Sequence, residues 1–378
     1  MIYFDNAATT RILPEVIEEM NKSFEEHWGN PSSTHRQGQK SRAAIEKSRE
    51  TIAKLLQVDA KEIIFTSGGA ESNNLILRGA LKVNESKGKH LITSKIEHST
   101  VLRTCQALEK EGYEVTYIDV TERGVIDLEQ LKNAIRNNTV VISVMYVNNE
   151  TGVVQPIDEI AEMIEGKGIV LHTDAVQGVG KEMILPKKQG IHALSAAAHK
   201  FYGPKGTGFL YLDQNYMIEK EITGGSQERN RRSGTENVHG IVGMAKALEI
   251  VYSDMEEEQA KEKEMQIYLE EALKKEICNI KINCGNSRRI SSVVNITLED
   301  CNVQTLMVAL DMEGICVSGG SACMSGAMET SHVLKAMGAS EEDLKSSIRV
   351  SIGRYNTKDE IDIFIQKLKE IVARERAK

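Results

Sequence analysis

The sequence is poor in cysteine and has no excess of positive charge, and each shortage excludes a class of protein. The six cysteines, which form no Cys-x-x-Cys pair and no zinc-type spacing, lie at positions 105, 278, 284, 301, 316 and 323. We therefore expect neither a disulfide framework nor a metal site. The 47 basic and 55 acidic residues give a net charge of −8, which repels nucleic acids and anionic membrane surfaces. We expect no direct partner of either kind.

Long apolar runs and prolines are also scarce in this chain of 378 residues. It begins Met1-Ile-Tyr-Phe-Asp5, without the basic region or the apolar core of a signal peptide, and no later run is long and uncharged. We therefore expect a cytoplasmic protein. Only 5 prolines and no low-complexity tract interrupt the sequence, so we expect it to fold throughout. Its length suits a large domain plus a smaller one.

Apolar, strand-like runs alternate with amphipathic helical stretches through the middle of the chain. The runs cover residues 90–94, 114–119, 140–147, 169–174 and 208–213. Such alternation is typical of a mostly parallel sheet covered by helices. Expected strands at 281–284, 293–296 and 348–352 and an expected helix at 302–313 indicate a smaller α/β unit further on. Between the two, a charged stretch at 252–265 has helical spacing, and we interpret it as a solvated helix rather than a binding tail.

The most informative stretch is residues 195–206, an apolar strand that leads into His199, Lys200 and a turn containing glycine and proline. A lysine after an apolar strand is usually a solvated cap. An amine held in a partly dry site, however, loses some of its preference for the charged form and can form a Schiff base with a carbonyl. Lys200 is therefore a candidate catalytic residue if other segments complete a site around it.

Three other segments place glycines or polar groups at the ends of expected strands. Residues 62–74 pass through Gly68 and Gly69 into a helix, which suits phosphate binding, although two glycines before a helix are more often a plain turn. Residues 168–177 end a strand in Asp174, and residues 140–152 end one in amides and a carboxylate. A phosphate cradle, an acid, amides and a Schiff-base lysine together are what pyridoxal 5'-phosphate requires of a protein.

At this point the chain resembles the cysteine desulfurases of the class V aminotransferase group, which are fold-type I pyridoxal-phosphate enzymes. The segments that carry the resemblance run nearly from end to end and are residues 4–10, 29–33, 97–98, 224–229, 232–235, 321–323 and 346–354. The last two separate desulfurases from ordinary aminotransferases. The resemblance implies an α/β fold: a large domain, residues 12–255, with a mostly parallel seven-stranded sheet covered by helices. A smaller α/β domain, residues 1–11 and 256–378, would carry the cysteine loop.

The resemblance also implies a role for individual residues around the cofactor. Lys200 would form the Schiff base, Asp174 would face the pyridine nitrogen, and His98 would stack on the ring and move protons. Without the resemblance, His98 is more often a structural histidine. Asn149 and Gln177 would lie near the ring oxygen and the bound substrate. The phosphate region would include Gly69, Ala70, Ala197, His199 and Thr235, with Thr235 reaching the neighbouring subunit of a homodimer.

For the substrate, the resemblance implies that Arg354 binds the α-carboxylate of L-cysteine, a task that suits a planar guanidinium. Cys323 lies among small residues and glycines, which favour a mobile loop. It would accept the sulfur as a persulfide, leave L-alanine, and pass the sulfur to an acceptor protein for iron–sulfur cluster assembly or tRNA thiolation. Without the resemblance, a cysteine is more often a buried hydrophobic residue.

Two positions depart from the family pattern near the expected phosphate. Ala70 stands where threonine is usual, and Ala197 where serine is usual. We expect weaker anchoring of the phosphate for this reason, because two hydroxyl donors are missing.

Two alternatives remain open from the sequence. The same lysine and cofactor would serve a selenocysteine lyase or an activity on cysteine sulfinate, since only the leaving group on Cβ differs. The loss of two phosphate ligands also leaves room for a non-catalytic binding or regulatory protein with the same fold.

Overall fold

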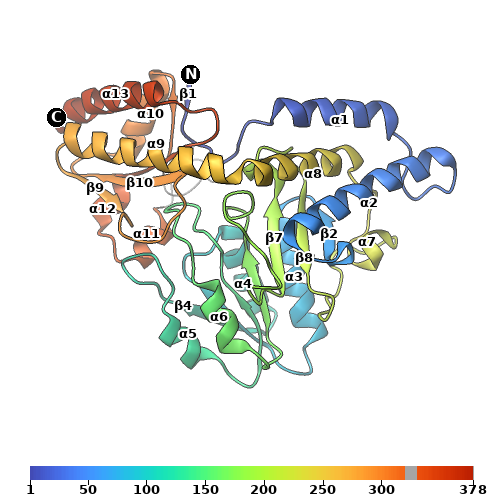
Figure 1. The fold of residues 1–378 in the computed structure, drawn as a ribbon. Coiled ribbons are helices and arrows are strands. Elements are labelled where there is room, and N and C mark those ends of the chain that lie inside the picture. Colours follow the sequence, from blue (N-terminus) through green and yellow to red (C-terminus); the bar gives the residue numbers. More distant parts are fainter. Residues whose placement is uncertain (320–329, 378) are drawn as a thin grey trace.

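The computed structural model describes residues 1–319 and 330–377 (Figure 1). Its strands are β1 (Ile2–Tyr3), β2 (Ile63–Thr66), β3 (His90–Ser94), β4 (Glu114–Ile118), β5 (Thr139–Ser143), β6 (Val170–Asp174), β7 (Ala193–Ala197), β8 (Gly208–Leu212), β9 (Ile280–Asn283), β10 (Val293–Leu298), β11 (Ile315–Cys316), β12 (Ser318–Gly319) and β13 (Ser347–Ser351).

The helices lie between these strands and cover them. They are α1 (Pro14–Glu26), α2 (Arg36–Leu56), α3 (Gly69–Val83), α4 (Ser99–Lys110), α5 (Leu128–Ala134), α6 (Ile157–Ile164), α7 (Gln227–Asn230), α8 (Val238–Ser253), α9 (Met255–Glu276), α10 (Val303–Met312), α11 (His332–Ala336), α12 (Glu341–Lys345) and α13 (Lys358–Arg376), with short 3-10 helices η1 (Ala60–Glu62) and η2 (Ala198–Lys200).

The large sheet has seven strands in the order β2-β8-β7-β6-β5-β3-β4. Neighbouring strands from β7 to β4 run parallel, and β8 runs antiparallel to both β2 and β7. Every residue of β3, β5, β6, β7 and β8 is buried, as expected for strands covered on both faces. This confirms the predicted mostly parallel, seven-stranded sheet.

Two apolar cores form on the two faces of this sheet. On one face, α3 and α4 pack against the strands, with Leu75 and Leu108 among the buried side chains. On the other face, α2, α6 and α8 contribute Ile52, Ile160 and Leu248 to a larger core. Burial of these stripes stabilises the sheet by about 25 cal/mol per Å² of apolar surface removed from water.

A four-stranded antiparallel sheet, in the order β12-β13-β10-β9, forms the centre of the second unit. Its core includes Leu269 of α9, Phe364 of α13 and also Phe4 from the start of the chain, whose ring centroid lies 5.6 Å from that of Phe364. The N-terminal segment thus packs with the C-terminal part of the chain. The boundaries at residues 11/12 and 255/256 stay a prediction, and Ile290 and Val293 pack with the core of the large sheet.

The expected strand at residues 140–147 is shorter in the structure, where β5 ends at Ser143. The chain beyond it still follows β6, because the amide of Tyr146 donates to the carbonyl of Asp174. The charged stretch at 252–265 is helical as predicted, and Asp254 alone separates α8 from α9 (Figure 1).

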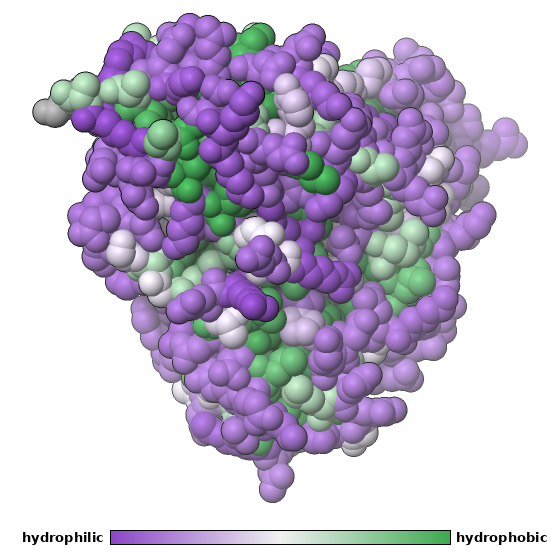
Figure 2. Space-filling view, turned by 60° about the vertical axis from the view of Figure 1, so that its left-hand side comes forward, coloured by the Kyte–Doolittle hydropathy of each residue, from purple (hydrophilic) through white to green (hydrophobic). Residues whose placement is uncertain are grey.

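Hydrophilic residues cover most of the face in Figure 2, and hydrophobic residues form small patches among them. Within residues 1–319 and 330–377, no helix combines the length and the apolar composition that crossing a membrane requires.

Candidate active site

A cavity of about 840 Å³ opens where the carboxyl ends of the parallel strands meet. Ligands of open α/β sheets bind at this edge. The predicted residues that line it are Gly69, Ala70, His98, Asn149, Asp174, Gln177, Ala197, His199 and Lys200. The fold therefore brings together residues spread over more than a hundred positions of the sequence.

Lys200 ends η2, the short helix that follows β7. Its Nζ donates to the carbonyl oxygens of Ala7, at 2.7 Å, and Ala8, at 2.8 Å. Burial lowers the pKa of Lys200 to about 7, and the positive charges of Arg349 and Lys181 act in the same direction. An amine with such a pKa is substantially neutral near pH 7 and is therefore a competent nucleophile toward a carbonyl.

Asp174, the last residue of β6, is 4% exposed. Its Oδ2 accepts a hydrogen bond from Asn73 Nδ2 at 2.7 Å, and its Oδ1 accepts one from the amide of Val176 at 3.1 Å. These two donors fix the direction of the carboxylate at the wall of the cavity. A buried carboxylate in a fixed position can hold a protonated ring nitrogen.

His98 caps the N-terminus of α4. Its Nδ1 lies 2.9 Å from Thr100 Oγ1, and its ring faces the cavity. Desolvation by the surrounding protein lowers the pKa of His98; Lys200 and His332 lower it further, and Asp174 opposes them. The imidazole is therefore neutral near pH 7, so one ring nitrogen can accept a proton.

Glu97 precedes His98 and is completely buried. Its Oε1 accepts hydrogen bonds from Ser94 Oγ at 2.6 Å and from the amide of Met145 at 2.9 Å. Burial raises the pKa of Glu97 to about 8, so the side chain is mostly protonated near pH 7. The hydrogen bond to the amide of Met145 therefore holds the turn that carries His98 against the residues that follow β5.

The glycines before α3 leave the backbone open to the cavity. Gly68 has φ +148°, and an added Cβ there would meet no atom within 4 Å. An added Cβ at Gly69 would instead lie 2.6 Å from Val176 Cγ2, so only glycine fits there without rearrangement. Backbone N–H groups at the start of a helix bind anions, and α3 presents such groups at this wall.

Two further side chains stand near that wall. His199 Nδ1 lies 3.2 Å from Thr9 Oγ1, and burial lowers the pKa of His199 to about 4. Lys205 also lines the cavity and supplies a positive charge. Ala70 and Ala197 also line the cavity, but alanine has no hydroxyl group to offer a phosphate.

The structure does not place Arg354 at the cavity. Its guanidinium pairs with Asp254, at 2.9 Å, and Glu258, at 3.2 Å, and lies over the ring of Tyr202. Two other arginines line the cavity, Arg103 of α4 and Arg349 of strand β13, and Arg349 is 5% exposed. Its Nη2 donates to Asp5 Oδ1 at 2.8 Å and its Nη1 to the carbonyl oxygen of Asn149 at 2.8 Å.

Two predicted residues remain. Thr235 is exposed in the turn between α7 and α8 and is not among the residues that line the cavity. Cys323 lies outside the described residues.

Sequence reasoning missed Asn73 and Arg349, and it did not give the N-terminal segment a place in the site. Asn73 lies on α3 one turn beyond Gly69, so helical spacing from the glycines identifies it. Arg349 is a charged residue inside an apolar strand, which is itself an unusual position. Ala7 and Ala8 act through backbone carbonyls, for which residue identity gives no signal.

The donor set fits pyridoxal 5'-phosphate. An amine with a lowered pKa faces the cavity together with a buried carboxylate, a neutral imidazole and a helix N-terminus. These groups match the aldehyde, ring nitrogen, ring face and phosphate of that cofactor. Within the described ranges, no group of three His, Cys, Asp or Glu side chains that could hold a metal ion was found.

Comparisons with known proteins identify relatives along nearly the whole chain. The class-V aminotransferase family matches residues 2–364. A protein named cysteine desulfurase IscS from Dictyoglomus turgidum is 43% identical over 375 residues, which cover 99% of this chain and 95% of that protein. One of the same name from Methanosarcina thermophila is 44% identical over 375 residues, covering 99% of this chain and 93% of that protein.

Solved structures give the same result for the fold. A NifS-like protein superimposes with a TM-score of 0.93 at 37% identity, covering 98% of this chain and 99% of that one. A NifS-like protein from Rickettsia africae superimposes with a TM-score of 0.90 at 34% identity, covering 99% of each chain.

Proposed function

Because the chain belongs to the class-V aminotransferases and, within them, to the cysteine desulfurases, we propose that its cavity converts L-cysteine to L-alanine and transferable sulfur. The protein is accordingly a pyridoxal-phosphate-dependent enzyme. The observation that carries the proposal is Lys200, an amine with a pKa of about 7, in one cavity with Asp174 and His98.

Lys200, Asp174 and His98 would hold the cofactor. Asp174 would keep the ring nitrogen protonated, and Lys200 would supply the amine that attaches the cofactor. When bound, the cofactor supplies an electron sink for the pair that is left when a Cα–H bond breaks. His98 would face the ring and, being neutral, would accept or return a proton.

Arg349 is proposed as the residue that binds the substrate carboxylate, in place of Arg354. It lines the cavity, and its Nε is buried without a hydrogen-bond partner among the described residues. A guanidinium with a free N–H can form a further charge-assisted hydrogen bond. Arg354 has its guanidinium committed to Asp254 and Glu258, and it lies outside the cavity wall.

Cys323 is proposed as the sulfur acceptor. Its thiolate would attack the sulfur of the substrate, an S–S bond would form and the Cβ–S bond would break. The electron pair would stay with Cβ, which gains a proton and becomes the methyl group of alanine. The persulfide would then pass to an acceptor protein, such as an iron–sulfur scaffold or a tRNA-thiolation enzyme.

A homodimer with shared sites is part of the proposal, and exposed apolar side chains support it. Phe24 and Trp28 are 53% and 70% exposed, and the ring of Phe24 packs on His239 at the start of α8. Thr235 lies a few residues before that helix. A second copy that covers this surface would bury the aromatic residues and bring Thr235 to another subunit's phosphate region.

The absorbance of the cofactor tests the proposed site. Adding pyridoxal 5'-phosphate to the full chain should give a visible band that shifts when L-cysteine is added. Lys200→Ala should lose the native band while keeping the fold by circular dichroism. A native chain that binds no cofactor would contradict the proposal.

A further inference from the structure

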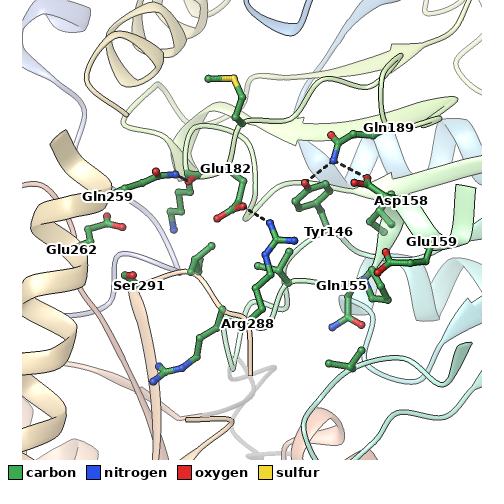
Figure 3. Close-up of a pocket in the computed structure, with 18 residues that line it drawn as sticks. Tyr146, Gln155, Asp158, Glu159, Glu182, Gln189, Gln259, Glu262, Arg288 and Ser291 are labelled. Atoms are coloured by element: carbon green, nitrogen blue, oxygen red, sulfur yellow. Dashed lines mark hydrogen bonds and ion pairs between the residues drawn. The ribbon is translucent and has the colours of Figure 1, made fainter. Parts of the chain in front are cut away.

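The segment after β6 contributes to the walls of two cavities. Gln177 lines the candidate site, whereas Lys181, four residues later, lines a second cavity of about 740 Å³. Figure 3 shows this second cavity. That second cavity also contacts Glu182 and Arg288, which pair at 3.1 Å, and Glu262 of helix α9. Its walls carry charges of both signs, so they favour no single class of ligand. Its informative feature is the contact between Lys181 and Gln177.

The two ends of the Gln177 carboxamide have different partners. Its Oε1 accepts from Lys181 Nζ at 3.4 Å, and its Nε2 donates to the carbonyl oxygen of Ala7 at 2.8 Å. A lysine ammonium has donors only, and a carbonyl oxygen is an acceptor only. The reversed amide would place NH₂ against an ammonium and oxygen against oxygen. Lys181 and Ala7 therefore select one of the two orientations.

The selected orientation reaches the reactive amine. The carbonyl of Ala7 that accepts from Gln177 also accepts from Lys200 Nζ at 2.7 Å. Lys181 is thus linked to Lys200 through the Gln177 side chain and the backbone carbonyl of Ala7. Gln177 offers an N–H donor to the candidate site only while its oxygen is held on the other side.

We propose that Lys181 is a positioning residue that holds the Gln177 carboxamide with its N–H groups toward the cofactor. This inference rests on the proposed binding of pyridoxal 5'-phosphate in the cavity. In that arrangement Gln177 donates a hydrogen bond to an acceptor oxygen of the cofactor or substrate.

The surroundings of Lys181 suit this role. Gln259 Nε2, from α9, donates to the backbone carbonyl of Lys181 at 2.6 Å and so fixes the position of its backbone. Burial lowers the pKa of Lys181, and the carboxylate of Glu262 on the same helix opposes this. Lys181 also contributes to the lowered pKa of Lys200, after burial and Arg349. The effect of this charge on Lys200 is expected in the pH midpoint of the cofactor band, whereas the contact with Gln177 is expected in the cofactor affinity.

Lys181→Met tests the proposal, because methionine keeps the length of the side chain and removes its donors. The apo form of the full-length variant is titrated with pyridoxal 5'-phosphate, and the pH midpoint of the cofactor band is recorded. We expect about tenfold weaker cofactor binding, the effect of one charge-assisted hydrogen bond, and a shifted midpoint. Lys188→Met, an exposed lysine in the same loop, is the matched control and should leave both values unchanged.

A double variant separates positioning from a structural role. If Lys181 acts through Gln177, then Lys181→Met combined with Gln177→Leu should weaken binding no more than Gln177→Leu alone, to within about twofold. Losses that multiply, or native affinity in Lys181→Met, would overturn the proposal.

If Lys181→Met does not fold, a variant that keeps an N–H donor at position 181 still tests the proposal. Lys181→Arg should bind the cofactor within about threefold of the native chain, and a tenfold loss in this folded variant would overturn the proposal. These readouts need cofactor binding only, so a native chain that releases no alanine would contradict the proposed function without deciding the role of Lys181.

Discussion

Asn73 donates to Asp174 and to Thr100 from the same nitrogen, with Nδ2 2.7 Å from Asp174 Oδ2 and 2.9 Å from Thr100 Oγ1. Thr100 Oγ1 in turn lies 2.9 Å from His98 Nδ1. One amide on α3 therefore holds both the acid and the imidazole that the proposed site requires. The positions of both side chains therefore depend on Asn73, which itself lines the cavity.

Replacing Asn73 should loosen this arrangement. In Asn73→Leu the carboxylate of Asp174 loses a buried hydrogen bond worth about 1.5–3 kcal/mol, so we expect at least about tenfold weaker binding of pyridoxal 5'-phosphate. Fluorescence titration of the apo chain measures this. Asn74→Leu is the control, since Asn74 bonds to the carbonyl of Ala70 and to Thr104 of α4 but not to Asp174 or Thr100. Equal affinity in the two variants would contradict the role given to Asn73.

Substitutions of Arg349 and Arg354, the two arginines of the 346–354 segment, should have different effects on the KM for L-cysteine. Arg349→Lys keeps the charge but loses the planar pair of donors, so we expect the KM for L-cysteine to rise by about tenfold or more. Arg354→Lys should leave KM unchanged and lower stability, on the order of 1 kcal/mol, because it weakens the pairs with Asp254 and Glu258. A large change of KM in Arg354→Lys alone would restore the role that the sequence suggested for it.

The two alanines at the expected phosphate should limit cofactor retention. Ala70→Thr combined with Ala197→Ser adds two hydroxyl donors at positions that line the cavity, and each can contribute about 1.5 kcal/mol, or about tenfold in affinity. Release of pyridoxal 5'-phosphate on dialysis should slow in the double variant, and less so in each single one. Unchanged release would show that backbone N–H groups or water already satisfy the phosphate.

Glu97 should make stability depend on pH. Its pKa is raised from 4.5 to about 8 by burial, so the folded chain binds more protons than the unfolded chain between these values. The contribution of Glu97 to stability is therefore fully present below about pH 4.5 and is lost as the pH rises through 8.

Urea unfolding of native chain and Glu97→Gln at pH 6 and pH 9 measures this effect. The glutamine variant mimics the protonated side chain and does not titrate. Relative to the native chain, its free energy of unfolding should therefore be higher at pH 9 than at pH 6. An equal difference at the two pH values would mean that Glu97 does not titrate in this range.

Much of the fold follows from the order of apolar runs along the sequence. The five strands expected between residues 90 and 213 are present. Strand β5 is shorter than expected, because the apolar residues after Ser143 still run beside β6 but no longer form a regular strand. The position of β8, antiparallel between β2 and β7, needed the structure, since strand order depends on contacts distant in sequence.

The site was predicted where a residue's chemistry is visible in its identity. Asp174 ends a strand, Lys200 and His98 follow strands within a few residues, and all three line the cavity. Arg349 and Arg354 are chemically identical and five residues apart, so only the direction of each side chain from β13 and the loop after it distinguishes them. The carbonyl of Ala7 has no signature at all, yet it accepts from both Gln177 and Lys200.

The most direct test of the account is alanine released from L-cysteine under reducing conditions by the cofactor-loaded native chain and by Cys323→Ala. We predict alanine from the native chain and its loss in the variant, with pyridoxal 5'-phosphate still bound to both. No alanine from the native chain, or equal amounts from the two, would contradict transfer of sulfur to Cys323. Release of alanine from selenocysteine by the variant would indicate the related lyase activity instead.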